Sequence, residues 1–163
     1  MNEYDPSTAY PCRARPVHPV PVEPHGQPVI IFLTVCTKNR RPVLASPDTH
    51  LLIREVWSGA SHWLVGRYMV MPDHLHLFCS PGTIPSRALK NWVSYWKSEL
   101  SRLLGAREGS FWQKDFWDTQ IRRRESYAAK WEYVRNNPVR AGLVLKTADW
   151  PYQGELNSLR WRE

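Results

Sequence analysis

Two histidines separated by one residue, His74 and His76, are the first side chains whose spacing suggests chemistry. They lie in residues 74–79, an apolar run typical of a β-strand that follows a Pro-Asp turn dipeptide at 72–73. Because successive side chains of a strand alternate between its faces, both imidazoles are expected on one face. Two convergent imidazoles are a common start to a metal site. A solvated strand surface is the alternative for such a pair.

A tyrosine is the second candidate, in a helix predicted over residues 125–136. The apolar stripe of this helix consists of Tyr127, Trp131 and Val134, at spacings of four and three. At about 100° per residue, Tyr133 falls about 120° from the stripe, beside Lys130. Core packing does not explain an aromatic residue there, so Tyr133 is either a half-exposed surface residue or a functional one.

Basic side chains around the same helix indicate a surface for phosphates, because the guanidinium fork donates to them in pairs. The predicted DNA-binding residues are Arg122, Arg123, Arg124, Lys130, Arg135 and Arg140. Exposed tryptophans could stack on unpaired bases. The helical spacing of Trp92 and Trp96 places these two in a core instead, whereas the sequence leaves Trp112 and Trp117 open between the two uses.

The chain has 163 residues, which fits one domain with tails, and 22 Lys plus Arg against 15 Asp plus Glu give a net charge of +7. This balance points to a polyanionic partner, either nucleic acid or an anionic membrane surface. Residues 86–146 hold 13 of the basic and 6 of the acidic residues. The excess charge therefore lies in the segment that carries the predicted tyrosine helix.

Several classes of protein are disfavoured. The longest uncharged apolar stretch, residues 29–37, is far shorter than the ~20 residues of a spanning helix. The first residues lack the pattern of a signal peptide. Three scattered cysteines form no CxxC pair, which argues against a disulfide framework and a cysteine-rich zinc site. We expect a reduced, cytoplasmic protein, monomer or homodimer, with no membrane contact and no protein partner.

The remaining pattern predicts alternating strands and helices. Strands are expected over 29–37, 63–71 and 74–79, with a fourth strand or irregular extended stretch over 111–121. Helices are expected over 48–57, capped by Asp48, over 86–104, ended by Gly105, and over 125–136. These elements indicate an α+β fold, an antiparallel sheet covered by helices.

Prolines define the first boundary, because seven of the 14 fall within residues 1–28. This Pro-rich N-terminal arm is expected to be a disordered tail, with a DNA-contacting arm as the alternative. The catalytic domain is expected over 29–147, and residues 148–163 are expected to form a C-terminal tail.

Four segments resemble the single-tyrosine HUH transposases, most closely the REP-associated tyrosine transposases. They are MPDHLHL (71–77), FWQKDFWD (111–118), Ile121-Arg122 and YVRNNPVRAGLV (133–144), in family order within residues 28–153. Asp73 departs from the family, which more commonly has Asn before the first histidine, and the N-terminal arm has no family role. The resemblance implies a ferredoxin-like (RRM-like) sheet covered by helices on one face, in a domain that cuts and rejoins single-stranded DNA.

The resemblance also implies roles for individual residues. His74 and His76 would bind a divalent metal, Mg²⁺ or Mn²⁺, and Tyr133 would be the nucleophile. Asn137 would be the third metal ligand; its i, i+4 spacing from Tyr133 agrees, although Pro138 disfavours helical backbone at Asn137. Because imidazole suits Mn²⁺ better than Mg²⁺, we expect Mn²⁺ to work at least as well. No organic cofactor is expected.

The sequence thus predicts a metal-dependent DNA transesterase that cleaves and rejoins single-stranded or hairpin DNA through a 5′-phosphotyrosine intermediate. One alternative is an RRM-like module that binds single-stranded nucleic acid without chemistry. Another is a metallophosphodiesterase that uses activated water, whose cleavage would survive Tyr133→Phe.

Overall fold

The computed structural model describes residues 29–83 and 85–159, so the predicted N-terminal arm and the end of the predicted tail lie outside the described residues. Two short 3-10 turns, η2 and η3, accompany the regular elements. In chain order the elements are β1 (Ile30–Cys36), η2 (Lys38–Arg40), α1 (Pro47–Gly59), β2 (Trp63–Val70), β3 (His74–Pro81), α2 (Leu89–Leu103), β4 (Trp117–Ile121), α3 (Arg124–Arg135), α4 (Asn137–Arg140), η3 (Thr147–Asp149) and β5 (Gln153–Glu155).

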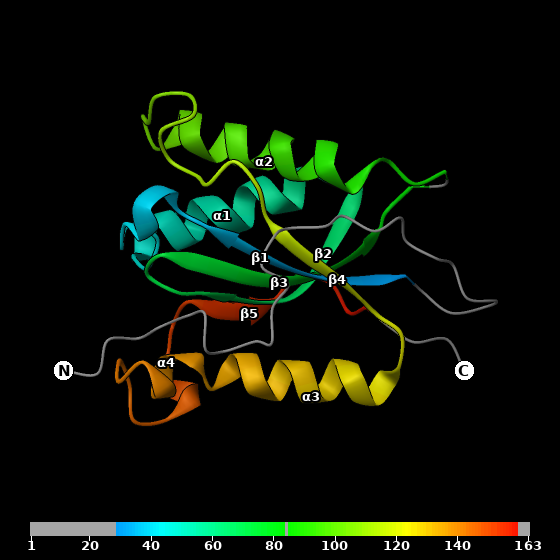
Figure 1. Cartoon of the computed structure of the whole chain (residues 1–163), viewed down its shortest axis with the longest axis vertical. Coiled ribbons are helices and arrows are strands. Elements are labelled where there is room, and N and C mark those ends of the chain that lie inside the picture. The colour runs from blue at the N-terminus through cyan, green and yellow to red at the C-terminus, as the bar shows by residue number, and fades with distance from the viewer. Residues whose placement is uncertain (1–28, 84, 160–163) are drawn as a thin grey trace.

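The strands form one antiparallel sheet in the order β4-β1-β3-β2-β5. The succession β1-α1-β2-β3-α2-β4 is the ferredoxin-like βαββαβ unit, and β5 extends it at the β2 edge. The predicted α+β class is therefore confirmed. In this unit α1 and α2 lie together on one face of the sheet, as predicted (Figure 1).

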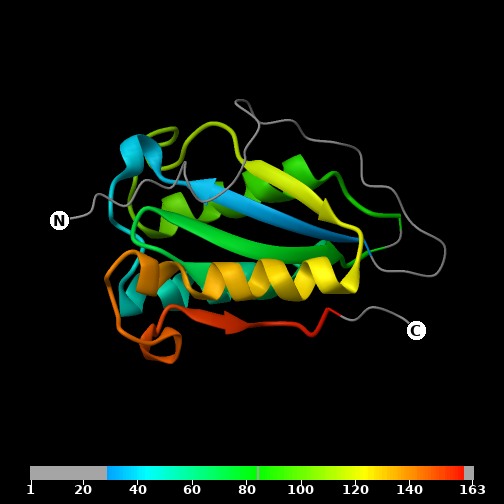
Figure 2. The same cartoon turned by 60° about the horizontal axis from the view of Figure 1, so that its bottom comes forward.

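The opposite face of the sheet is covered too, by α3, which differs from the prediction of helices on one face only (Figures 1 and 2). The reason is that β1 is apolar on both faces: Leu33 and Val35 join the core under α1 and α2, whereas Ile30 and Phe32 belong to a second core. We call this second core the α3 core. Its buried members are Ile30, Phe32, Met69, Met71, Phe78, Ile121, Val134 and Trp150.

Tryptophans dominate the main core. Trp92 and Trp96 are buried with ring centroids 6.1 Å apart, which confirms the interpretation of their helical spacing. Trp112 is also buried, its centroid 5.7 Å from that of Trp96, and its Nε1 donates to the Lys97 carbonyl. Trp112 is therefore a core residue and not a surface for bases, whereas Trp117 is half-buried in β4.

Helix boundaries differ from the predictions where capping and proline decide them. The cap of α1 is Ser46, whose side chain accepts a hydrogen bond from the Thr49 amide, and not Asp48, which lies in the first turn. At the other boundary, α3 ends at Arg135 and a new helix begins at Asn137. Pro138 then occupies the first turn of α4, where its missing N–H costs no hydrogen bond, so the proline and a helical Asn137 are compatible.

Part of the predicted C-terminal tail completes the sheet. The Trp150 indole is buried and donates to the Val70 carbonyl at 3.0 Å, and β5 pairs with β2. Residues 148–159 thus pack on the domain because Trp150 contributes a large apolar side chain to the α3 core. Among the described residues, no helix is both long and apolar enough to cross a membrane.

Candidate active site

His74 and His76 open strand β3 and face the α3 side of the sheet. They pair across to Cys36 and Thr34 of β1, and their ring centroids lie 4.8 Å apart at an interplanar angle of 80°. The shared face predicted from strand alternation is therefore confirmed. Their exposed fractions are only 1% and 2%, so the alternative of a solvated surface pair is wrong.

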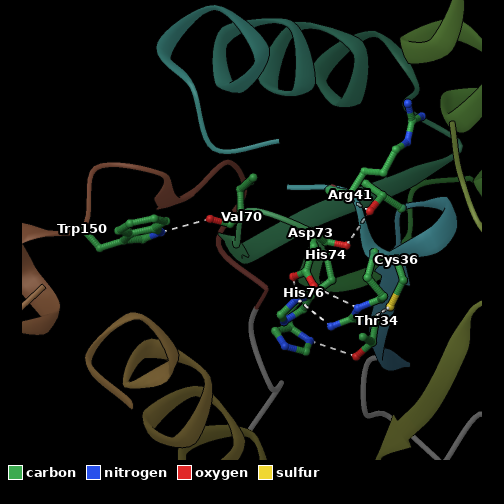
Figure 3. A network of polar contacts seen from close by, with 10 residues as sticks. Thr34, Cys36, Arg41, Val70, Asp73, His74, His76 and Trp150 are labelled. Atoms are coloured by element: carbon green, nitrogen blue, oxygen red, sulfur yellow. Dashed lines mark hydrogen bonds and ion pairs between the residues drawn. The ribbon is translucent and has the colours of Figure 1, made fainter. Parts of the chain in front are cut away.

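Each imidazole is held through its Nδ1 atom (Figure 3). Nδ1 of His74 lies 2.7 Å from Oδ1 of Asp73, and Nδ1 of His76 lies 2.8 Å from Oγ1 of Thr34. A polar partner on one ring nitrogen orients the ring and directs the other nitrogen to a metal. A divalent ion would therefore be bound through Nε2 of both histidines.

Burial controls the protonation of the pair. It lowers the pKa of His74 despite the adjacent carboxylate of Asp73, and it lowers the pKa of His76 well below the usual value. His74, Lys130, Arg40 and Arg140 lower the pKa of His76 further by charge repulsion. Both imidazoles are therefore neutral near neutral pH, the state that metal binding requires.

Asp73 is the acidic residue of the site. Burial alone would raise the pKa of its carboxyl, but the hydrogen bond and charge of His74, together with Arg40, outweigh burial and lower it. The Arg40 Nε atom lies 2.9 Å from Asp73 Oδ2. Sequence reasoning missed both Arg40 and Thr34: Thr34 lies in the predicted strand 29–37, but nothing in the spacing of that strand indicates its contact with His76, and Arg40 lies outside every predicted element.

The second half of the candidate site lies on α3 and α4. Tyr133 is half-buried, and Asn137 is fully buried at the start of α4. Arg140 joins them: its guanidinium carbon lies 4.0 Å from the Tyr133 ring centroid, and its Nη2 donates to the Tyr133 carbonyl and to Oδ1 of Asn137. The i, i+4 relation of Tyr133 and Asn137 is thus supported by a shared arginine.

The two halves face each other within one chain. Phe32 stacks on His76 with centroids 5.3 Å apart and an angle of 18°, and the Lys130 ammonium of α3 lies 5.2 Å from the Phe32 ring centroid. The positive charges of Lys130 and Arg140 lie close enough to His76 to lower its pKa, after the larger effects of burial and of His74. Helices α3 and α4 therefore bring Lys130 and Arg140, respectively, to the histidine side of the sheet.

The donors of the site fit a divalent ion of borderline character. The described parts of the chain contain no group of three or more His, Cys, Asp and Glu side chains that could hold a metal. The predicted set is instead two imidazoles and the amide of Asn137. Asn137 is fully buried, its Oδ1 accepts a hydrogen bond from Arg140, and its Nδ2 has no hydrogen-bond partner among the described residues. The amide oxygen, which is the atom that would bind the ion, would therefore have to be shared with Arg140 or exchanged with Nδ2 by a turn of the amide. Imidazole and amide donors together suit Mn²⁺ or Mg²⁺.

The other predicted DNA-binding residues lie apart from the histidines. Arg122, Arg123 and Arg124 are exposed where β4 leads into α3. A helix of 12 residues is about 18 Å long, so they lie about that far from α4. Arg135 lies on the other flank of α3, where it pairs with Glu132 at 3.0 Å. Only Lys130 and Arg140 of the predicted basic set therefore contribute charge at His76.

A ferredoxin-like sheet with paired histidines on β3 and a tyrosine-bearing helix over them is the arrangement expected of a single-tyrosine HUH transposase. The chain is 27% identical over 126 residues to a REP-associated tyrosine transposase of Escherichia coli, covering 74% of this chain and 73% of that one. It is 31% identical over 96 residues to a second such protein, named as putative, of Haemophilus influenzae, covering 51% and 53%. The chain is therefore related to the REP-associated tyrosine transposases, as its motifs predict.

The fold has a counterpart among solved structures. A REP-associated tyrosine transposase bound to a REP hairpin superposes with a TM-score of 0.71 at 21% identity, covering 85% of this chain and 81% of that one. This likeness establishes the shared fold. No family model matches the chain.

Proposed function

We propose that the protein is a metal-dependent DNA transesterase that cuts and rejoins single-stranded or hairpin DNA, with Tyr133 as the nucleophile. The observation that carries the proposal is that α3 and α4 of the same chain cover the face that bears His74 and His76. Arg140 contacts both Tyr133 and Asn137, and its charge reaches His76. The relatives' name, and the REP hairpin bound by the structural neighbour, support hairpin DNA as the substrate.

The proposed reaction exchanges one phosphate ester for another. The Tyr133 oxygen loses its proton to solvent and attacks phosphorus; a P–O bond forms to tyrosine as the bond to the 3′ oxygen breaks. The products are a 5′-phosphotyrosine and a free 3′-hydroxyl. Attack by a 3′-hydroxyl on the phosphotyrosine reverses the step and rejoins the strand, so no ATP is consumed.

The residues of the chain have separate tasks in this reaction. His74, His76 and Asn137 would hold the divalent ion, which polarises the scissile phosphate and stabilises its developing charge when bound. Arg140 holds the tyrosine ring from one side, and Lys130 places a positive charge near the histidines. The exposed arginines 122–124 would contact DNA phosphates away from the cut.

The test is covalent trapping on hairpin DNA with Mn²⁺, followed by denaturing electrophoresis. We expect an adduct with wild type and none with Tyr133→Phe. The matched control is Tyr127→Phe, which removes a hydroxyl from the same helix on its packed side, with its ring 4.6 Å from that of Phe78; it should keep the adduct. Wild-type binding without an adduct across a panel of hairpins would indicate a binding module. Strand cleavage by Tyr133→Phe would indicate attack by water.

A further inference from the structure

We infer that Arg40 and Asp73 position His74 for metal binding. Asp73 holds the Nδ1 hydrogen of His74, and Arg40 holds Asp73, so that Nε2 of His74 keeps its lone pair for the ion. The inference rests on the proposed function, in which His74 is a metal ligand. Asp73 is also the residue at which this chain departs from the commoner family sequence, and Arg40 lies outside every segment that resembles the family.

The tautomer of His74 follows from its contacts. An ionised carboxylate only accepts hydrogen bonds, so Nδ1 of His74, at 2.7 Å from Asp73 Oδ1, must carry the hydrogen. Arg40 Nη2 lies 3.4 Å from the same nitrogen and would demand the opposite tautomer. The shorter distance is optimal for a hydrogen bond, whereas the longer one is beyond the usual range. The Asp73 carboxylate therefore determines the tautomer of His74: the hydrogen is on Nδ1 and the lone pair is on Nε2.

His76 provides an internal contrast. Its Nδ1 contacts the Thr34 hydroxyl at 2.8 Å, and a hydroxyl can rotate to donate or to accept. That contact orients the ring but permits either tautomer. Of the two proposed ligands, only His74 thus has its tautomer fixed before metal binds, and Asp73 is the residue that fixes it.

The backbone turn at residues 39–40 explains how the Arg40 side chain reaches Asp73. Asn39 and Arg40 have φ values of 57° and 53°, in the left-handed region that residues other than glycine rarely adopt. Such strain persists only where the surrounding contacts over-determine it. Here Arg40 Nε lies 2.9 Å from Asp73 Oδ2 and its Nη1 donates to Cys36 Sγ at 2.6 Å, while the Thr37 amide donates to the Asp73 carbonyl at 3.0 Å. The strained turn is therefore fastened to Asp73 by both side chain and backbone.

The test compares Arg40→Gln with Arg41→Gln. Both lose one positive charge from the same turn, but the Arg41 guanidinium extends away from the histidines, where it donates to the Ser110 carbonyl at 3.0 Å (Figure 3). Two readouts need no DNA: the His74 tautomer from ¹⁵N NMR at about pH 7.5, and Mn²⁺ affinity from calorimetry. Losing the direct partner of a metal ligand typically costs about 10–100-fold in affinity. Arg40→Gln leaves Asp73 beside His74 but no longer held in place, so we expect a loss of about 10-fold, with the hydrogen of His74 still on Nδ1. Arg41→Gln should match wild type.

Asp73→Asn is the second variant, should Arg40→Gln fail to fold. It loses the charge that holds Arg40, and its amide can either accept from or donate to Nδ1, so we expect a mixed His74 tautomer and weaker Mn²⁺ binding. A wild-type His74 with its hydrogen on Nε2, or wild-type Mn²⁺ affinity in both variants, would overturn the inference. The covalent adduct separates it from the proposed function: an adduct with unchanged Mn²⁺ affinity in the variants refutes the inference alone. A tautomer change and weaker Mn²⁺ binding without any wild-type adduct refute the proposed function alone.

Discussion

Because His74 and His76 are buried, the stability of the folded protein depends on pH in the acidic range. Burial lowers the pKa of both His74 and His76 in the folded protein, whereas in the unfolded chain their pKa returns to about 6.5. As the pH falls through that value, the unfolded chain takes up protons that the folded chain does not. The stability linked to these groups is therefore complete above about pH 6.5 and declines below it.

We expect the free energy of unfolding, measured with urea, to fall between about pH 7.5 and about pH 5, by up to about 1.4 kcal/mol per pH unit for each buried histidine. His76→Gln should make this slope shallower. His62→Gln is the control, because His62 is exposed and its removal should leave the slope unchanged. The lowered pKa of Asp73 does not interfere, since the stability it contributes is lost only below its ordinary value of 3.8. Equal slopes in all three proteins would contradict the expectation.

At the scale of single residues, the sequence predicted relations that local geometry sets. Strand alternation predicted the shared face of His74 and His76, and helical spacing predicted that Tyr133 lies off the packed stripe. It could not predict the contact of Arg40 with Asp73. The two residues are 33 positions apart, and their contact depends on a left-handed turn at 39–40, for which Asn39 is a favourable residue but Arg40 is not.

Helix α3 is the element that decides where Tyr133 lies. Val134, the next residue, is fully buried in the α3 core, and Tyr127 and Trp131 pack against that core. The stripe of these three residues was predicted correctly. The face of the sheet on which α3 packs was not, because an amphipathic pattern shows that a helix has a buried side but not what covers it.

We expect Val134→Ala and Val93→Ala to lower the free energy of unfolding by similar amounts, about 1–3 kcal/mol each, because both remove the same atoms from fully packed sites. Only Val134→Ala should also slow adduct formation, since only this residue seats the helix that carries Tyr133. Val93 lies on α2, across the sheet. Denaturant unfolding and the rate of adduct formation, both measured where the variants are folded, check the expectation. Equal loss of rate in the two variants would show that α3 packing has no special role.

At the scale of the whole molecule, charge is divided between the two layers of helices. Arg122, Arg123 and Arg124 are exposed at the start of α3, and Lys130 and Arg140 lie on the same layer. On the opposite layer, Arg102 of α2 is paired with Glu99. Five of the six predicted DNA-binding residues, arginines 122–124, Lys130 and Arg140, therefore lie on the layer that bears the proposed nucleophile.

We expect hairpin DNA binding without added metal to weaken as salt rises, because phosphate contacts release counterions. Arg122→Gln should reduce the magnitude of the slope of log affinity against log salt by about 0.7–0.9, the value of one phosphate contact. Arg102→Gln carries the same change of charge on the other layer and should keep the wild-type slope. Salt titrations of both variants by fluorescence anisotropy test this. A smaller slope for Arg102→Gln would contradict the expectation, because it would indicate that DNA contacts the layer of α2.

The order of strands also bears on how the protein is made. The two histidines belong to β3, whereas the tyrosine lies in α3, which follows β4 in the chain. A chain still growing on the ribosome therefore contains the two histidines of the proposed site well before it contains Tyr133 and Asn137. A partial chain that ends before α3 lacks Tyr133, so under the proposed mechanism it cannot break a DNA strand.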